Sequence, residues 1–216
     1  MKEIDFSGLD LRKVTNMNGV FGNCSSLEKI DLHGCNTENL EGMYGFAAGC
    51  TNLKSVNLNG INTQKVKYMD ELFKDCESLT EVDLTSLKTD CVESLTAMFE
   101  NCTNLTLVDL SNFYTPNLSS ISKMFYGCTS LTSVNLSNMN TSNVGTITRM
   151  FANCSSLEKI DISNFDTTNV GWAVETFSGC TKLKEILVGE KWKNIDEIEN
   201  NSNIFYNCGV DNVTKK

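Results

Sequence analysis

The sequence predicts an α/β solenoid, a curved stack of repeats with a parallel sheet on its inner side and short helices on its outer side. Three observations predict this fold. Eight of the ten cysteines recur along the chain, and the first seven of these stand 26 residues apart. Columns of leucine, isoleucine or valine, threonine and phenylalanine keep the same interval. Within each interval the apolar spacing changes from that of a strand to that of a helix. The recurring cysteines are Cys24, Cys50, Cys76, Cys102, Cys128, Cys154, Cys180 and Cys208.

The first part of each repeat is predicted to be a strand. In residues 128–154, Leu131 is followed by Val134 and Leu136, which alternate with polar residues. This alternation is typical of a half-buried strand, and equivalent strands of stacked repeats pair in parallel about 4.8 Å apart. A single repeat is too small to bury its own apolar face, so the repeats must stack. We therefore expect eight parallel strands, from Ile4 and Phe6 to Ile186 and Val188.

The second part of each repeat is predicted to be a short helix. In the second part of residues 128–154, the apolar residues would lie within an arc of about 120° on the surface of a helix. These residues are Val144, Ile147, Met150, Phe151 and Cys154. The preceding Thr141, Ser142 and Asn143 can cap the first amides of a helix. Pro116 takes the equivalent place in another repeat, where a helix start tolerates proline. A helix after each strand would make the outer wall the wider one.

The whole chain, residues 1–216, is predicted to be a single solenoid domain. Residues 1–24 form a partial first repeat, residues 25–180 form six full 26-residue repeats, and residues 181–216 form an atypical closing repeat or cap. In the closing repeat the cysteine interval stretches to 28 residues, and Trp192 supplies a large apolar cover. The chain begins inside a strand, without the Cys-x-x-Leu that opens the later repeats. We therefore expect this segment to be part of a longer chain.

The repeat resembles the leucine-rich repeats of BspA-type bacterial surface proteins. The resemblance rests on Leu-x-x-Val-Asn-Leu-Ser-Asn-Met-Asn-Thr-Ser-Asn-Val, residues 131–144, and on the closing Met-Phe-x-x-Cys of residues 150–154. It covers nearly the whole chain. The resemblance implies an extracellular or cell-surface location, because members of that family are generally surface-displayed. Some members are implicated in adhesion to host proteins or to other cells.

Charge and composition narrow the range of partners. The chain carries 27 acidic and 18 basic residues, a net charge of −9. Such a surface repels phosphate backbones and anionic lipids, so we expect no nucleic-acid partner. No apolar run approaches the ~20 residues of a membrane-spanning helix, so we expect no membrane span in this segment. The first residues lack the apolar core of a signal peptide.

The cysteines allow three interpretations. Metal sites use closely spaced ligand pairs, which the 26-residue interval does not supply. Successive cysteines lie close enough for disulfides, but side chains in register point the same way, so the required torsion is awkward. Free cysteine behaves as a small buried hydrophobe, and we expect buried, reduced thiols from Cys24 to Cys180. Outside this column, Cys35 is expected in the core and Cys91 is expected to be more exposed.

A column of acidic or amide residues is the candidate binding site. It lies between two inward-facing strand residues, so its side chains face outward on the sheet. Each side chain could bond a neighbouring donor, hold a calcium ion or contact a basic partner, although no calcium-binding loop motif is present. The inner sheet of a solenoid is a continuous surface, so we place ligand contact there, centred on the last four residues of the column. The candidate residues are Asp31, Asn57, Asp83, Asp109, Asn135 and Asp161.

A second outward column varies between repeats, as a binding surface does and a uniform spacer does not. It contains Lys29, Ser55, Glu81, Leu107, Ser133, Lys159 and Glu185. This variation favours binding over a purely structural role.

Nothing in the sequence indicates catalysis. His33 is the only histidine, and it stands where other repeats carry small polar residues. We expect no enzyme activity, no metal and no other cofactor. The sequence favours a non-catalytic, surface-exposed binding or adhesion module that recognises a protein or cell-surface ligand, and the acidic column favours a basic partner. The alternative is a structural spacer in a larger modular surface protein.

Overall fold

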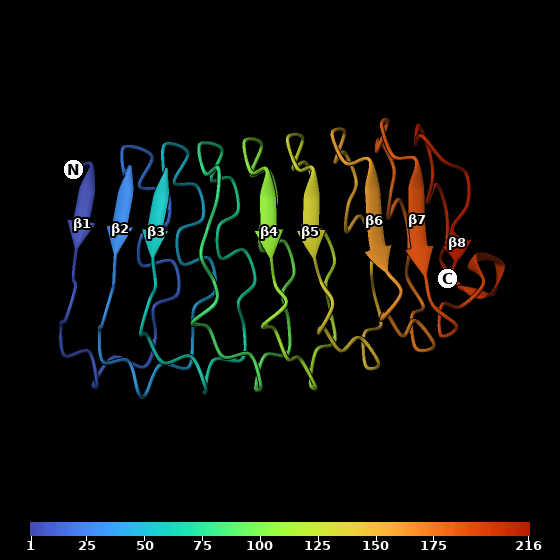
Figure 1. Ribbon diagram of the computed structural model, residues 1–216. Helices are drawn as coiled ribbons and strands as arrows, with labels where there is room; N and C mark the ends of the chain where they lie inside the picture. Colours follow the sequence, from blue (N-terminus) through green and yellow to red (C-terminus); the bar gives the residue numbers. More distant parts are fainter.

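The computed structural model describes residues 1–216 and shows a parallel β-solenoid (Figure 1). The strands stand side by side in chain order, with the amino terminus at one end of the stack and the carboxyl terminus at the other. The predicted parallel solenoid is therefore confirmed. The strands are β1 (Glu3–Asp5), β2 (Lys29–Asp31), β3 (Ser55–Asn57), β4 (Leu107–Asp109), β5 (Ser133–Asn135), β6 (Lys159–Ile162), β7 (Glu185–Val188) and β8 (Thr214–Lys215).

The stack consists of eight coils, each ending at one of the recurring cysteines. Coils 1 to 4 are residues 1–24, 25–50, 51–76 and 77–102, and coils 5 to 8 are residues 103–128, 129–154, 155–180 and 181–208. Each coil has a sheet wall, which carries the strand position, and an opposite turn wall, which is residues 16–24 in coil 1 and the equivalent residues in the others. The last residues, 209–216, add β8 to the edge of β7.

The strands pair in the register that the repeat predicts. Ile4 lies opposite Ile30, and Val108 lies opposite Val134, so each pairing joins residues one repeat apart. The central strand residue points inward to the core, as Ile30 and Val108 show by their burial. The outward side chains before and after it form the exposed face of the sheet wall.

The sheet is interrupted at coil 4. Residues 81–83 form no strand, which divides the sheet into β1–β2–β3, β4–β5 and β6–β7–β8. The prediction of a strand at Val82 and Leu84 is therefore wrong, although Leu84 is buried as expected. The amides of Val82, Asp83 and Leu84 donate no hydrogen bond within the protein. Coil 4 thus keeps its core side chains while its strand backbone stands apart from both neighbours.

The turn wall contains no α-helix, so the prediction of outer helices is wrong. The only helical segment is η1, a three-residue 3₁₀ helix at Ile195–Glu197. Along the turn wall, successive amides donate alternately to a carbonyl of their own coil and to a carbonyl of the next coil. The Met124 amide donates to the Ile121 carbonyl of its own coil at 3.3 Å, whereas the Phe125 amide donates to the Met150 carbonyl of the next coil at 2.9 Å. Amides that bond the next coil cannot build the ladder of an α-helix.

Residues with positive φ produce this alternation. Lys123 and Arg149 have φ values of 56° and 55°, and Gly127 and Asn153, four residues after each, have values of 73° and 64°. A residue in the left-handed region ends a right-handed helical turn. The apolar spacing therefore identifies the side chains that face the core, but two left-handed residues in every coil replace the helix by consecutive turns.

The turn walls of successive coils are also bridged in parallel. The bridges join Ser94 to Ser120 and Ser120 to Thr146, for example. Strand-like bridging on both walls gives both walls the same coil spacing. The predicted curvature depended on a wider outer wall made of helices. That wall is absent, so the reason for the predicted curvature is absent too.

The threonine column joins the coils instead of capping helices. Thr63 Oγ1 donates to the Lys88 carbonyl at 2.8 Å and accepts the Lys88 amide at 2.8 Å. Thr141 makes the same two bonds with Asp166. The predicted helix cap at Thr141 is therefore wrong, and Pro116 begins a turn rather than a helix. The buried members of the column are Thr37, Thr63, Thr89, Thr115, Thr141 and Thr167.

A row of phenylalanines runs through the core beside the turn wall. From Phe73 to Phe205 the rings stack with centroids 5.5–5.9 Å apart. Such aromatic pairs contribute about 0.5–1.5 kcal/mol each beyond the burial of their surface. The row therefore ties each coil to the next along most of the stack.

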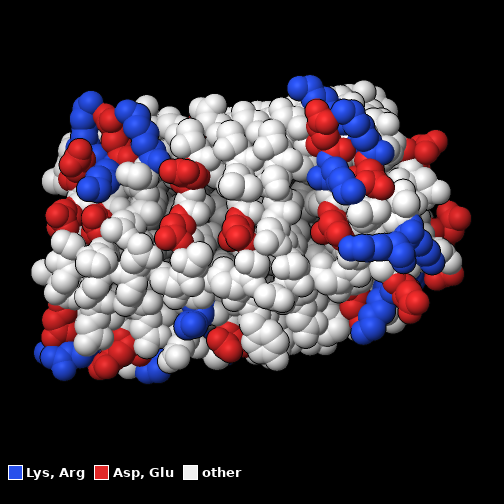
Figure 2. Space-filling model, in the orientation of Figure 1, with Lys and Arg blue, Asp and Glu red and all other residues white.

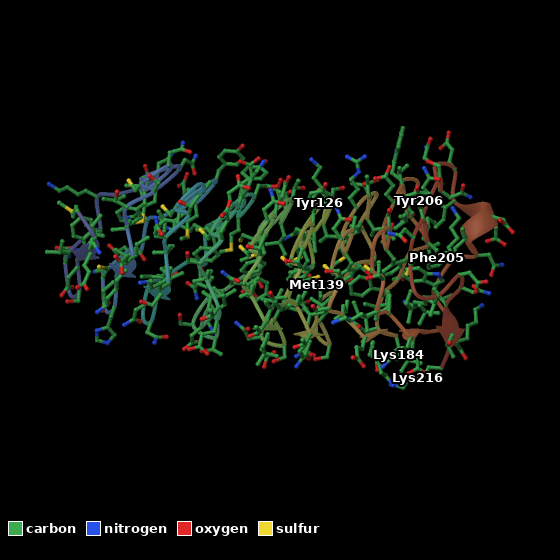
Figure 3. The ribbon with its side chains drawn as sticks, turned by 90° about the horizontal axis from the view of Figure 1, so that it is seen from above. Tyr126, Met139, Lys184, Phe205, Tyr206 and Lys216 are labelled. Carbon is green, nitrogen blue, oxygen red and sulfur yellow. The ribbon has the colours of Figure 1, made fainter.

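All ten cysteines are free thiols. The sulfur atoms lie along the middle of the stack (Figure 3). Cys50 to Cys180 and Cys35 are buried and Cys91 is exposed, as predicted, but Cys24 is exposed, so its predicted burial is wrong. Each buried thiol donates to a backbone carbonyl, as Cys128 Sγ does to Phe99 at 3.1 Å. Cys24 is exposed because it belongs to coil 1, which has no coil packed before it.

The two ends of the stack differ. At the carboxyl end Trp192 is 5% exposed, and Ile198 and Ile204 are also buried. At the amino end Phe6 and Val20 of coil 1 are 39% and 50% exposed. The apolar columns are therefore covered at one end of the stack only.

Candidate binding site on the sheet wall

The six candidate residues all occupy the same place in the repeat, the third residue of the strand position. In each the side-chain Oδ1 accepts the amide of the residue two positions later, as Asp109 does from Ser111 at 2.9 Å and Asn135 from Ser137 at 3.2 Å. The others make the same bond, and they are Asp31, Asn57, Asp83 and Asp161. A short polar side chain in this position stabilises the turn that follows the strand. The column therefore has the backbone role that was one of the three interpretations of the sequence.

The turn bond uses only one of the two oxygens of each carboxylate, and it leaves the carboxylate charged. The hydroxyl and amide of Thr85 hold the pKa of Asp83 below its ordinary value. The amide and hydroxyl of Ser111 do the same for the pKa of Asp109. Because the hydrogen bonds favour the charged form, both side chains carry a full negative charge on the sheet wall at neutral pH.

Ion pairs distinguish the ends of this column from its centre. Asp31 lies 3.8 Å from Lys29, and Asp161 lies 3.1 Å from Lys216, where each distance joins a carboxylate oxygen to Nζ. Neither Asp83 nor Asp109 has such a partner. In Figure 2 most Lys and Arg side chains lie toward the two ends of this face, and acidic side chains lie near its middle as well as at the ends. The structure thus brings Asp83 and Asp109 together as uncompensated charges, and it sets Asp161 apart.

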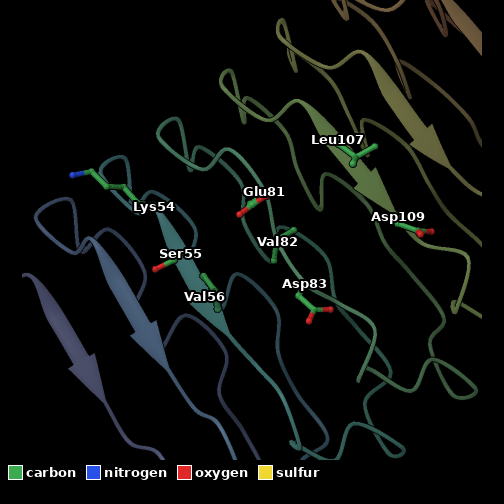
Figure 4. A pocket seen from close by; sticks show the side chains of 8 residues that line it. All are labelled: Lys54, Ser55, Val56, Glu81, Val82, Asp83, Leu107 and Asp109. Carbon is green, nitrogen blue, oxygen red and sulfur yellow. The ribbon is translucent and has the colours of Figure 1, made fainter.

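The interruption of the sheet at coil 4 opens a hollow beside these charges. Its volume is about 420 Å³. Figure 4 shows the lining side chains on three successive coils. The lining residues are Lys54, Ser55, Val56, Glu81, Val82, Asp83, Leu107 and Asp109. The hollow therefore has an acidic rim, a single lysine at one side and three apolar residues, Val56, Val82 and Leu107, in its lining.

Three residues of the second outward column, Ser55, Glu81 and Leu107, line this hollow. Glu81 stands beside Asp83 and, like it, has no ion-pair partner, while Leu107 is 55% exposed at the other side of the hollow. Sequence reasoning noted their variability but did not assign them to the site. The available signal was that Leu107 is the one apolar residue among the variable positions. The break in the sheet has no counterpart in the sequence, because Val82 and Leu84 fit their columns.

The arrangement suits recognition of a cation with an apolar stem. No group of three or more His, Cys, Asp or Glu side chains in the structure is placed to hold a metal ion. The unpaired amides of Val82, Asp83 and Leu84 add hydrogen-bond donors at the hollow. Lysine and arginine side chains bury their aliphatic stems against apolar surface while their charged ends remain solvated.

None of the helical segments has the length and apolar character needed to cross a membrane.

Solved structures share this fold. The T. pallidum leucine-rich repeat protein aligns at 20% identity with a TM-score of 0.50, and the alignment covers 85% of this chain and 72% of that protein. A leucine-rich repeat protein from Bacteroides ovatus aligns at 21% identity with a TM-score of 0.36 over 100% of this chain and 65% of its own length. The first of these confirms the predicted resemblance to bacterial leucine-rich-repeat proteins at the level of the fold.

No curated protein matches the chain. A family model matches it twice, over residues 1–107 and 93–215, so that together the matches span nearly the whole solenoid. The chain therefore belongs to the family DUF285, described as a Mycoplasma protein of unknown function.

Proposed function

We propose that this solenoid is a non-catalytic protein-binding module that recognises a basic protein through the sheet wall at coil 4. The observation that carries the proposal is the group of uncompensated carboxylates, Glu81, Asp83 and Asp109, around a hollow whose lining also includes apolar residues. Carboxylates at the two ends of the same column, Asp31 and Asp161, are neutralised by lysines. Uncompensated charges beside a hollow are suited to a partner of opposite charge.

The partner's contact residue is a lysine or arginine. Its charged end would lie between Asp83 and Asp109, and its stem would pack on Leu107, which is exposed and apolar. The amides of residues 82–84 would supply donors to carbonyl groups of the partner. Contact between exposed charges weakens with salt, because the Debye length shortens to about 8 Å at physiological ionic strength.

Surface exposure and adhesion are part of the proposal by resemblance to BspA-type repeats. In that setting the solenoid stands outside the cell and binds a host protein or a cell-surface protein. The alternative is a spacer, which the regular phenylalanine and threonine columns would serve equally well. A spacer does not require uncompensated charges, so these charges favour a binding function.

The test is a charge-neutral variant that keeps the turns. Glu81→Gln/Asp83→Asn/Asp109→Asn removes three negative charges, and asparagine already occupies this column at Asn57 and Asn135, where it makes the same turn bond. The matched control, Glu38→Gln/Glu41→Gln/Asp90→Asn, removes three exposed charges outside the sheet wall. Both are compared with the parent chain in a solid-phase assay against host matrix proteins at low and high salt.

The sheet-wall variant should bind about tenfold more weakly at low salt, from three exposed pairs at about 0.2–1 kcal/mol each. The control should bind as the parent chain does. Equal binding by the two variants would place the contact elsewhere on the solenoid. Failure of the parent chain to bind any matrix protein at low salt would favour the spacer.

A further inference from the structure

The carboxyl-terminal tail, residues 209–216, takes the place of a further strand. It lays β8 in parallel beside β7, on the edge of the sheet that faces away from the rest of the stack (Figure 1). In this pairing Lys215 lies opposite Val188. All eight coils carry an apolar residue in this column, from Phe6 and Leu32 to Val188. The tail therefore occupies the edge of the sheet with a strand that does not fit the apolar column.

The turn wall of coil 8 keeps free hydrogen-bond donors. Four amides of coil 7 donate to carbonyls of coil 8 at 2.7–2.9 Å, and they belong to Ala173, Glu175, Phe177 and Gly179. The equivalent amides of coil 8 donate no hydrogen bond within the protein, and they belong to Asn201, Asn203, Phe205 and Asn207. Asn203 and Asn207 keep positive φ values of 58° and 52°. Coil 8 thus offers four donors on the backbone path that joins coil 7 to it.

Coil 1 offers the matching acceptors. Amides of coil 1 donate to four carbonyls of coil 2, which belong to Gly42, Tyr44, Phe46 and Ala48. The equivalent carbonyls of coil 1 accept no hydrogen bond within the protein, and they belong to Asn16, Asn18, Val20 and Gly22. Gly19 and Asn23 both have φ values of 58°, so this turn wall follows the same path. Three residues of the core columns, Phe6, Leu9 and Val20, are exposed in this coil.

The tail leaves part of the carboxyl-end face uncovered. A hollow of about 650 Å³ lies there, because the tail supplies the strand of a further coil without its turn wall. Its apolar lining residues are Trp192, Ile195, Phe205 and Val213. Phe205 is the last ring of the stacked row, and Phe21 holds the same column in coil 1. The hollow is therefore placed to receive the apolar residues that coil 1 exposes.

The two end faces also carry opposite charges at matching positions. Asn16 and Asn200 occupy the same place in the row of parallel bridges. Lys13 stands three residues before Asn16, and Glu197 stands three residues before Asn200. Both side chains are exposed, and neither has an ion-pair partner within the chain. A coil 1 stacked on coil 8 would bring these two charges together.

We propose that the carboxyl-end face binds coil 1 of a second copy of this chain, and that the tail is a displaceable cap that blocks this contact. With the tail away, β1 of the second copy pairs with β7 and places Phe6 on Val188, where Lys215 lay. The four amides of coil 8 donate to the four free carbonyls of coil 1. Each copy binds the opposite end of the next, which gives an open filament instead of a closed dimer.

A second copy fits this edge better than an extended peptide does. The backbone between the four donors is not a strand, because Asn203 and Asn207 lie in the left-handed region. An extended peptide has no such residues, so its carbonyls cannot follow the path. The turn wall of coil 1 repeats the path, with its own left-handed residues at Gly19 and Asn23.

The tail is held by contacts that can open. The Lys216 amide donates to the Val188 carbonyl at 2.9 Å, and its Nζ lies 3.1 Å from an exposed carboxylate oxygen of Asp161. Both residues of β8 are exposed. A short strand with little buried apolar surface opens at a small cost in free energy. This contact is also independent of the proposed protein-binding site, so Glu81→Gln/Asp83→Asn/Asp109→Asn should associate as the parent chain does.

The test displaces the tail in the full chain. A Cβ atom at Gly209 would collide with the carbonyl oxygen of Leu183, so Gly209→Ala should force the tail away from coil 8. Sedimentation velocity from micromolar to millimolar concentration compares this variant with the parent chain. The variant should associate at a concentration at least about tenfold lower, because the face is competent only while the tail is away. Lys216→Glu leaves the core untouched and should act in the same direction by about twofold to fivefold.

Matched substitutions in the Gly209→Ala chain locate the contact. Leu9→Asp places a charge on the exposed face of coil 1 and should abolish association. Leu107→Asp makes the same change on the sheet wall, away from both ends, and should leave association unchanged. Association that persists in Leu9→Asp would overturn the proposal.

Hydrogen exchange of the Lys216 amide reports whether the tail has left. This amide should exchange faster in Gly209→Ala than in the parent chain. Fast exchange without association at any concentration would show that the exposed face does not bind a second copy. Unchanged exchange would show that the tail is not a displaceable cap.

Discussion

Lys216, the last residue, places its Nζ 3.1 Å from Oδ2 of Asp161, which stands 55 residues earlier in the chain. The contact crosses β7 from the short strand β8. The hydroxyl and amide of Ser163, with a smaller contribution from Lys216, lower the pKa of Asp161 to about 2. The tail thus neutralises one carboxylate of the sheet wall and leaves the charges at the hollow without a partner.

Single substitutions should separate these two kinds of carboxylate. Asp109→Asn should weaken binding of the basic partner about twofold to fivefold, because it removes an uncompensated charge. Asp161→Asn should change binding by less than twofold, because Lys216 already occupies that side chain. Both keep the turn bond, and the solid-phase assay at low salt measures them. A larger effect of Asp161→Asn would contradict the assignment of the site to coil 4.

The threonine column should be a major source of stability. Thr63→Val keeps the shape of the side chain but leaves both the amide and the carbonyl of Lys88 without their partner. Loss of two buried bonds should lower the free energy of unfolding by about 2–4 kcal/mol. Urea denaturation measures it, with the exposed Thr181→Val as the control. A change below 0.5 kcal/mol, roughly the scatter of surface substitutions, would show that the column does not join the coils.

Lys123 should be strained by its left-handed backbone. Lys123→Gly should be more stable than Lys123→Ala by about 1 kcal/mol, because only glycine adopts a φ of 56° without steric cost. Comparing the two variants with each other removes the effect of the lost Lys123–Glu100 ion pair. Urea denaturation of both variants gives the difference. A more stable alanine variant would contradict the positive φ and reopen the case for a helical turn wall.

The fold and the site were predictable from sequence to different degrees. Column positions such as Val108 and Val134 predict inward side chains and parallel register, because a fixed interval leaves only one way to stack. The same columns do not reveal where the amides donate, so the spacing from Val144 to Cys154 indicates a helix that the structure replaces with turns. Gly19 and Gly45 occupy the position with positive φ in coils 1 and 2, and a column of glycines there would have indicated a turn. In later coils Lys123 and other residues with side chains occupy this position, so the sequence does not show that column. The acidic residues at the hollow could be predicted from the sequence, but the break in the sheet could not.

Deprotonation of the buried thiols should limit stability at alkaline pH. Burial raises the pKa of Cys50 to about 11 and those of Cys128 and Cys180 to about 12, from an ordinary value of 9.0. Their folded-state pKa exceeds the unfolded one, so their contribution is complete below pH 9 and is lost as pH rises toward 11 to 12. Between pH 9 and 10 the free energy of unfolding should fall by about 1 kcal/mol for each such thiol.

Urea denaturation at several pH values checks this, with Cys128→Ala as a variant that has one thiol fewer to titrate. Its stability should fall less steeply with pH than that of the parent chain. A parent chain whose stability does not change between pH 9 and 10 would be inconsistent with buried, protonated thiols. In the native state at neutral pH, only the exposed Cys24 and Cys91 should react rapidly with a thiol reagent.

The most direct test of the proposed binding surface is amide hydrogen exchange in the presence and absence of the basic protein selected in the solid-phase assay. In the free chain the amides of Val82, Asp83 and Leu84, which have no acceptor, should exchange faster than that of Leu110, which donates to Asn135 at 2.9 Å. Binding should slow exchange in the segment around residues 81–84 and leave the turn wall unchanged. Slower exchange in the turn wall, with none in residues 81–84, would contradict a binding site on the sheet at coil 4.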